Sequence, residues 1–172
     1  KLENIKVDNI VVMGIGEPFD NFTNLVKAIK ILNCPKGIDL GSRRITVSTC
    51  GIVPKIKEFA ELDTQVNLAI SLHAPNQAIR EMLMPISKAY KMDELMSAVD
   101  YYISKTNRKV TMEYILLEGI NDSIENAKEL ASLLKGKLVY VNLIPYNSTS
   151  SNFKRSSKEK INAFYDELVK NK

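Results

Sequence analysis

The sequence predicts an α/β protein with a mostly parallel sheet, and three observations support this class. Short runs rich in Val, Ile, Leu and Tyr alternate with longer segments whose apolar residues recur at helical spacing. Each apolar run is followed by at least one such segment, as in the strand–helix units that build parallel sheets. Several runs are apolar at consecutive positions, which is typical of strands that are covered on both faces.

The strand-like runs are too few to close an eight-stranded barrel. The remaining choices are an open, doubly wound sheet and a partial barrel. No repeat or linker divides the chain, so we expect one domain over residues 1–172. The predicted strands are, in order, 9–13, 44–49, 65–72, 109–117 and 138–144.

Amphipathic segments between and after the strands predict helices. Asp122 or Ser123 is expected to cap the fifth helix, and Gly136 to stop it. The last helix should turn one apolar stripe inward, made of Ile161, Phe164, Tyr165 and Leu168. The predicted helices are 21–33, 53–62, 76–83, 92–106, 121–136 and 156–170.

Composition excludes several classes of protein. No apolar run is long enough to span a membrane, and the first residues lack the apolar core of a signal peptide, so a cytoplasmic location is expected. The net charge of +4 permits contact with nucleic acid without arguing for it. With two cysteines and one histidine, neither a disulfide framework nor a protein-only metal site is expected.

Polar residues gather where the predicted strands end. In parallel sheets these ends meet at one edge, where ligand sites form. Each strand brings such groups, namely Gly14, Gly16 and Glu17 after the first, Ser48 and Thr49 in the second, Ser71, Leu72 and His73 at the third, Glu113 in the fourth, and Asn142 and Asn147 at the fifth. The pattern predicts a binding rim for a polar small molecule. The alternative for each residue is local capping at a strand end that meets solvent.

Individual residues leave alternatives open. Glu17 follows glycines that give a ligand room to approach the backbone. Glu113 is either inward and paired or on one face of an amphipathic strand, and His73 is either functional or a structural histidine. The two cysteines, Cys34 and Cys50, are interpreted as core or loop residues without chemistry.

Other ligand classes lack their motifs. The glycine turn is not a dinucleotide fingerprint, because the third glycine would fall at Phe19. No Walker sequence and no serine-hydrolase elbow occur.

Five ordered blocks resemble one enzyme family along almost the whole chain. They resemble the radical S-adenosylmethionine (SAM) ribosomal RNA methyltransferases, and most closely the bacterial enzymes that methylate C2 of an adenine in 23S ribosomal RNA and in some transfer RNAs. The blocks are MGIGEPFDN, RRITVSTCGIVPKI, LAISLHAPNQAIREMLMPI, MEYILLEGIND and VNLIPYN.

The resemblance implies a fold and a cofactor site. The fold would be a partial (β/α)6 barrel, of which this chain carries the second to sixth strands with their helices. Glu17 would hold the amino group of SAM, and the zwitterionic methionine end and the ribose hydroxyls need such fixed polar partners. The residues implied around SAM are Gly16, Glu17, Ser48, Ser71, Leu72, His73 and Asn147.

Three features of the family are missing from this sequence. There is no C-x3-C-x2-C loop for the [4Fe–4S] cluster, and Cys34 and Cys50 cannot replace it. The cysteine that the family methylates near its C-terminus, and an upstream glutamate that accepts a proton, are absent too. We therefore expect a fragment of the radical SAM core, without catalytic residues or metal ligands of its own and inactive by itself.

The resemblance also implies partners and leaves alternatives. The parent enzyme would act on ribosomal and transfer RNA and need an external reductant for its cluster. Arg43, Arg44, Lys154 and Arg155 are candidate RNA contacts, unless they are solvated surface charges. Alternative functions are the C8-methylating relative that confers antibiotic resistance, and a non-catalytic SAM- or RNA-binding module.

Overall fold

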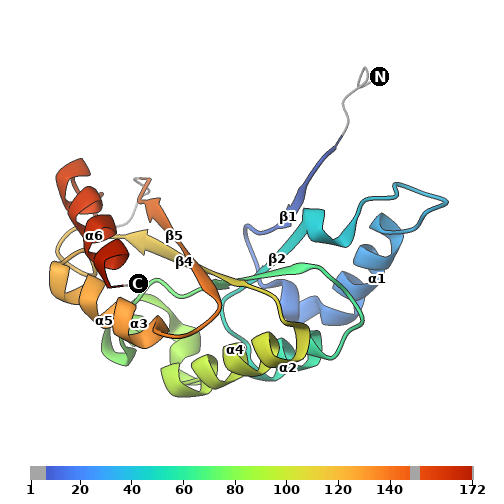
Figure 1. Ribbon diagram of the computed structural model, residues 1–172, viewed down its shortest axis with the longest axis horizontal. Helices are drawn as coiled ribbons and strands as arrows, with labels where there is room; N and C mark the ends of the chain where they lie inside the picture. Colours follow the sequence, from blue (N-terminus) through green and yellow to red (C-terminus); the bar gives the residue numbers. More distant parts are fainter. Residues whose placement is uncertain (1–6, 148–151, 172) are drawn as a thin grey trace.

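A computed structural model describes residues 7–147 and 152–171 and confirms the α/β class (Figure 1). The strands are β1 (Ile10–Val12), β2 (Ile45–Thr49), β3 (Asn67–Ser71), β4 (Val110–Leu116) and β5 (Val139–Pro145). The α-helices are α1 (Phe22–Leu32), α2 (Val53–Ala60), α3 (Gln77–Leu83), α4 (Met92–Thr106), α5 (Ile124–Leu134) and α6 (Lys158–Lys170). Short 3-10 helices are η1 (Pro18–Asn21), η2 (Ser42–Arg44) and η3 (Pro85–Lys88). None of the described helices is both long and apolar enough to cross a membrane.

The five strands form one parallel sheet in the order β1-β2-β3-β4-β5. A doubly wound sheet would reverse its strand order at a switch point. Here each strand pairs with its neighbours in sequence, which is the arrangement of a partial barrel. All carboxyl ends therefore meet at the same edge.

The two faces of the sheet differ in chemistry because side chains alternate along a strand. One face joins the hydrophobic core with the helices, through Ile45, Val47, Leu68, Ile70, Val110, Met112 and Tyr114. The opposite face is largely polar, with Thr46, Ser48, Asn67, Ser71, Thr111, Glu113 and Asn142. The register places Ser71 beside Glu113 and Glu113 beside Asn142, so these three form a row across the sheet. The polar side chains of the sheet thus lie on the face opposite the hydrophobic core.

Most predicted helix signals are confirmed. Ser123 caps α5 by accepting a hydrogen bond from Asn126 N at 3.1 Å, and Gly136 lies just beyond the end of this helix. Ser157 caps α6 through Lys160 N at 3.3 Å.

One core prediction is wrong. Tyr165 in α6 is 58% exposed, whereas Phe164 is fully buried and Ile161 and Leu168 pack partly against the core. Positions 161, 164 and 168 already make a complete helical stripe. Tyr165 lies about 100° further around the helix than Phe164, which turns it toward solvent.

Candidate functional site

The carboxyl edge of the sheet collects the segments that were predicted as a rim. The turn after β1, the residues that end β2 and β3, and the segment after β5 all lie there. Ser48 is buried in β2, while Asn147 is exposed just beyond β5. The predicted site residues at this edge are Gly16, Glu17, Ser48, Ser71, Leu72, His73 and Asn147.

Glu17 is held at the rim by two backbone N–H groups. Its Oε1 accepts from Phe19 N at 3.0 Å, which caps η1, and its Oε2 accepts from Cys50 N at 2.6 Å. The second bond ties the turn after β1 to the end of β2. An ionised carboxylate has about four acceptor positions, so each oxygen can still accept a bond from a ligand.

The glycine turn leaves open space beside this carboxylate. Gly14 and Gly16 have φ values of +129° and +108°, which side-chain-bearing residues rarely adopt. No atom lies within 4 Å of the position that a Cβ would take at either glycine. The backbone conformation, and not tight packing, is what requires glycine here, and a ligand can approach the chain.

The turn at the end of β3 is built around one carbonyl of β4. Leu72 N and His73 N both donate to Glu113 O, at 3.0 and 3.1 Å. His73 has a left-handed φ of +55°, which is uncommon for a residue other than glycine. Leu72 is fully buried, with its side chain in the core and its N–H bonded to Glu113 O. His73 and Ser71 are half-buried and remain accessible.

His73 is a neutral hydrogen-bond donor at ordinary pH. Burial, followed by the nearby Arg80 charge, lowers the pKa of His73 to about 4. Its Nδ1 accepts from Ile115 N at 3.1 Å. The ring proton of the neutral form therefore lies on Nε2, which can donate to a ligand.

Glu113 is buried and paired, and it also lies on the polar face of an amphipathic strand, so both of its sequence interpretations are met. It is 6% exposed, and its Oε2 accepts from Asn142 Nδ2 at 2.7 Å. Ser71 is its neighbour on the other side. A carboxylate and an amide thus extend the polar row from the rim down the open face of the sheet.

Neither cysteine shows the features of a catalytic nucleophile or a metal ligand. Burial, together with a hydrogen bond to Glu17, raises the pKa of Cys50 to about 12. Its sulfur is therefore a thiol and not the nucleophilic thiolate at neutral pH. Cys34 is exposed and lies just beyond α1. The described residues contain no group of three or more His, Cys, Asp or Glu that could hold a metal ion.

Two residues near the rim escaped prediction as functional. Arg80 in α3 is fully buried, and its Nη2 donates to Cys50 O at 2.7 Å. Asn121 is also fully buried and donates to His73 O at 2.8 Å. Asn121 was visible in the sequence only as one more polar residue after a strand. No local signal separates Arg80 from a surface arginine on a short helix.

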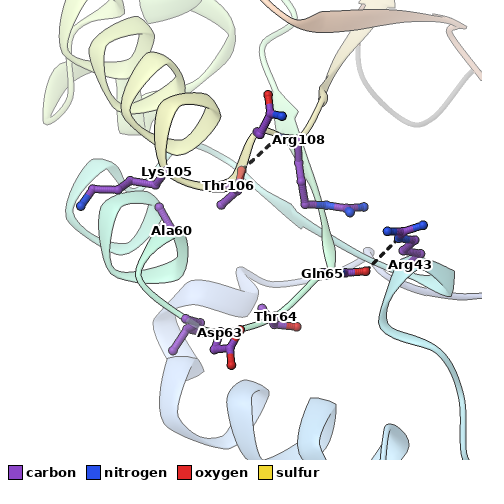
Figure 2. A pocket seen from close by; sticks show the side chains of 10 residues that line it. Arg43, Ala60, Asp63, Thr64, Gln65, Lys105, Thr106 and Arg108 are labelled. Atoms are coloured by element: carbon purple, nitrogen blue, oxygen red, sulfur yellow. Dashed lines mark hydrogen bonds between the residues drawn. The ribbon is translucent and has the colours of Figure 1, made fainter.

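Two pockets lie away from the rim. A pocket of about 370 Å³ sits at the amino ends of β3 and β4, where its lining includes Arg43, Lys105 and Arg108 (Figure 2). A groove of about 490 Å³ lies between β5 and the helices α5 and α6.

The structure separates the four basic candidates for RNA contact. Arg43 and Arg44 precede β2 at the amino edge, where Arg43 Nε donates to Gln65 and Arg44 pairs with Asp8 at 3.0 Å. Lys154 and Arg155 follow β5, and Arg155 pairs with Leu117 in a β-bridge just past β4. Only this second pair lies on the carboxyl side with the predicted rim.

Comparison with known proteins places these features in a sequence family. Residues 1–131 match the family described as the radical SAM superfamily. The "Probable dual-specificity RNA methyltransferase RlmN" of Spiroplasma citri is 62% identical over 98% of this chain and 49% of its own length. The protein of the same name from Acholeplasma laidlawii is 57% identical over 100% of this chain and 51% of its own length. The chain thus spans about half the length of these curated relatives.

Solved structures agree with the fold. A radical SAM methyltransferase from Sphaerobacter thermophilus superposes with a TM-score of 0.94 at 48% identity, covering 96% of this chain and 49% of that protein. A domain of pyruvate-formate lyase-activating enzyme from Bacteroides vulgatus gives a TM-score of 0.70 at 16% identity, over 96% of this chain and 95% of that domain. The second likeness concerns the fold alone.

Proposed function

The chain belongs to the radical SAM superfamily, and from this premise we propose that it is the SAM-binding core of an RNA methyltransferase. The supporting relatives are named dual-specificity RNA methyltransferases, and their identity with this chain runs from end to end. Since the chain spans about half of their length, the methyltransferase activity is proposed for the whole protein.

The observation that carries the proposal is the Glu17 carboxylate beside an open glycine turn. Two backbone N–H groups fix its position and leave acceptor capacity for a cationic group. The ammonium of the methionine moiety of SAM is such a group, and a charge-assisted bond to it is among the stronger hydrogen bonds. The open space beside Gly14 and Gly16 accommodates the approach.

The rest of the rim matches the remaining polar groups of SAM. Ser48 and Ser71 supply hydroxyls that both donate and accept, and neutral His73 supplies an N–H donor. Asn147 adds an amide beyond β5, at the end of the sheet opposite Glu17, and Leu72 supports the turn between Ser71 and His73 from within the core. In enzymes of this family, bound SAM supplies a radical when it is cleaved reductively. The role of this chain is to hold and orient it.

The [4Fe–4S] cluster of the family does not fit this chain. Such clusters are held by Cys thiolates, usually four, and this sequence has two cysteines in all. Cys50 is a protonated thiol tied to Glu17. We infer that residues 1–172 are a single domain and that the cluster ligands, the methyl-carrying cysteine and the proton acceptor belong to the rest of the protein. The chain alone is then inactive.

We favour C2 of adenine in 23S ribosomal RNA and transfer RNA as the target, on the resemblance of the five sequence blocks. On the protein side, Lys154 and Arg155 are the better RNA contacts, because they lie on the carboxyl side of the sheet. Arg43 and Arg44 lie at the opposite edge. A cytoplasmic location and an external reductant complete the proposal.

Glu17→Gln tests the cofactor site. The substitution keeps the shape of the side chain but removes the charge that would meet the ammonium. Calorimetric titration of SAM into the chain should show about 10- to 100-fold weaker binding, the usual worth of a hydrogen bond to a charged group. Glu118→Gln, an exposed acid beyond β4, is the matched control and should bind as wild type.

Methyl transfer tests the proposed reaction on the full-length protein. With its cluster and a reductant, it should place a methyl group on C2 of adenine in ribosomal RNA fragments and transfer RNA. Methylation at C8 would assign the reaction to the alternative relative. Equal SAM affinity of the Glu17→Gln and wild-type chains would contradict the assigned role of Glu17.

A further inference from the structure

Arg80 is a buried cation without an ionic partner. Its side chain is fully buried and is among the largest buried side chains of the core. It makes no ion pair within the described residues. Buried charges are normally paired because desolvation is costly. A role other than ion pairing is therefore needed to account for this arginine.

The guanidinium instead bridges two strand ends. Its Nη2 donates to Cys50 O at 2.7 Å and, more weakly, to Ser71 O at 3.5 Å. Nε and Nη1 have no hydrogen-bond partner among the described residues. Cys50 directly follows β2, and Ser71 is the last residue of β3. One side chain from α3 thus contacts the carboxyl ends of two adjacent strands.

Both contacts lead directly to predicted cofactor residues. Cys50 accepts from Arg80 through its carbonyl and donates through its N–H to Glu17 Oε2 at 2.6 Å. Ser71 opens the turn that ends in His73 with its left-handed φ. The Arg80 charge also contributes, after burial, to the low pKa of His73, which places the guanidinium near that ring.

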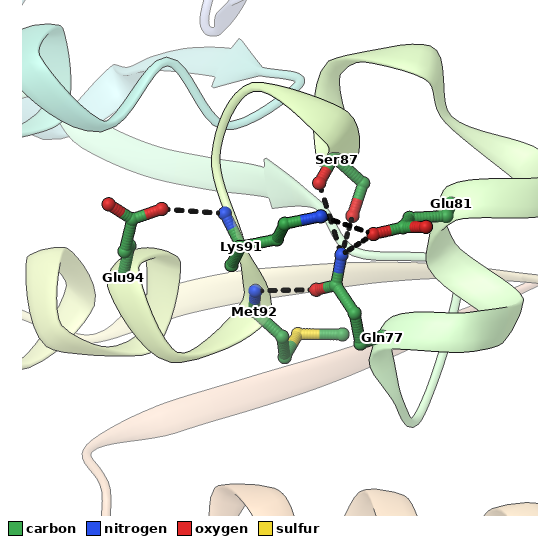
Figure 3. Close-up of polar contacts among 6 residues, drawn as sticks. All are labelled: Gln77, Glu81, Ser87, Lys91, Met92 and Glu94. Atoms are coloured by element: carbon green, nitrogen blue, oxygen red, sulfur yellow. Dashed lines mark hydrogen bonds and ion pairs between the residues drawn. The ribbon is translucent and has the colours of Figure 1, made fainter.

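The helix that carries Arg80 is anchored independently of it. Gln77 of α3 accepts from Met92 N at 2.7 Å and donates to Ser87 O at 3.1 Å (Figure 3). Lys91 Nζ pairs with Glu81 at 2.6 Å on the same side. These contacts bind α3 to η3 and α4, so removal of the guanidinium leaves the helix attached.

We propose that Arg80 is a positioning residue of the SAM site, which fixes Glu17 through Cys50 and fixes the Ser71–His73 turn through the Ser71 carbonyl. The inference rests on the proposed function, since it assumes that SAM binds at this rim. Arg80 is too deeply buried to touch the cofactor, so it acts through the residues it holds.

The test compares Arg80→Met and Arg80→Lys with Arg108→Met. Methionine keeps an unbranched apolar chain in the core, but it removes the donor to the Cys50 and Ser71 carbonyls and should lower the unfolding temperature. Lysine keeps the charge but cannot reach two carbonyls with a planar fork. Arg108 is the matched control, because it also has a buried Nε without a partner but lies at the amino ends of the strands, where it donates to Asn67.

Three readouts separate positioning from simple stability. Calorimetry of SAM with Arg80→Met should show at least tenfold weaker binding at a temperature at which thermal unfolding shows the variant to be fully folded. The His73 pKa, measured by NMR on the only histidine of the sequence, should rise by about one unit, the low end of the effect of a neighbouring charge. Arg80→Lys should keep the His73 pKa low and restore part of the affinity, and Arg108→Met should change neither.

Wild-type affinity in Arg80→Met would overturn the inference while leaving the SAM site intact. A wild-type chain that binds no SAM would refute the proposed cofactor site, and the inference with it. If Arg80→Met does not fold, Arg80→Lys decides the same comparison: full wild-type affinity with lysine would also overturn the positioning role.

Discussion

Asn121→Ala should destabilise the protein more than any exposed asparagine substitution. Asn121 is fully buried, and its Nδ2 donates to His73 O and to Ile115 O, both at 2.8 Å. Its Oδ1 accepts from Leu117 N at 2.8 Å. The side chain thus pairs three backbone groups from the turn after β3 and the end of β4. Alanine can replace none of these bonds.

The magnitude follows from the number of buried groups left unpaired. A net loss of about 1 kcal/mol for each of three hydrogen bonds gives about 3 kcal/mol, and complete desolvation of the orphaned groups would add to it. That is a large part of the roughly 5–15 kcal/mol that stabilises a typical domain. For a chain of this size the unfolding temperature should fall by about 6–12 °C.

Urea unfolding followed by circular dichroism measures this loss directly. Asn24→Ala is the matched control, because Asn24 is exposed on α1 and makes one side-chain bond to Asn21 Oδ1 at 2.7 Å. The control should stay within about 0.5 kcal/mol of wild type. If Asn121→Ala lost less than about 1 kcal/mol, the bonds of Asn121 would not hold this turn, and the reasoning would be refuted.

Three further outcomes are expected near the same edge. Gly51→Ala should lower the free energy of unfolding by about 1–3 kcal/mol in urea, because φ at Gly51 is +105° and the new Cβ would lie 3.0 Å from Arg80 Nη2. An unchanged free energy of unfolding would show that neither the backbone conformation nor this close approach restricts the position. At pH 8, iodoacetamide should label exposed Cys34 and spare Cys50, whose pKa is about 12. Equal labelling of the two cysteines by mass spectrometry would show that Cys50 is not kept protonated. The pKa of folded His73, about 4, lies below its ordinary 6.5, so the unfolded chain binds the proton more readily and stability falls as pH drops. Between pH 7 and pH 5 the free energy of unfolding of the wild type should fall by about 2 kcal/mol because of His73. The His73→Gln variant should lack this part of the fall when both proteins are compared by urea unfolding at the two pH values.

The secondary structure was predictable because its signals are local. Apolar runs located all five strands, and Ser123 and Gly136 marked the ends of one helix as expected. Parallel strands must also bring their carboxyl ends to one edge, so the location of the rim followed from the predicted parallel sheet. The identity of Glu17 as a rim residue needed nothing beyond its place after a glycine turn.

Side-chain partners depended on the tertiary structure, because they join residues that are far apart in the chain. The bond from Cys50 N to Glu17 spans 33 positions, and that from Asn121 to His73 spans 48. The burial of Arg80 likewise depends on two strand ends that meet only after folding. By itself the sequence determined the strands and the polar groups that follow them, since backbone periodicity and turn chemistry act over a few residues, whereas the order of the strands in the sheet came from the structure. Folding alone decided which polar group each rim residue touches and which basic side chains share its edge, because those contacts depend on how separate strands pack together.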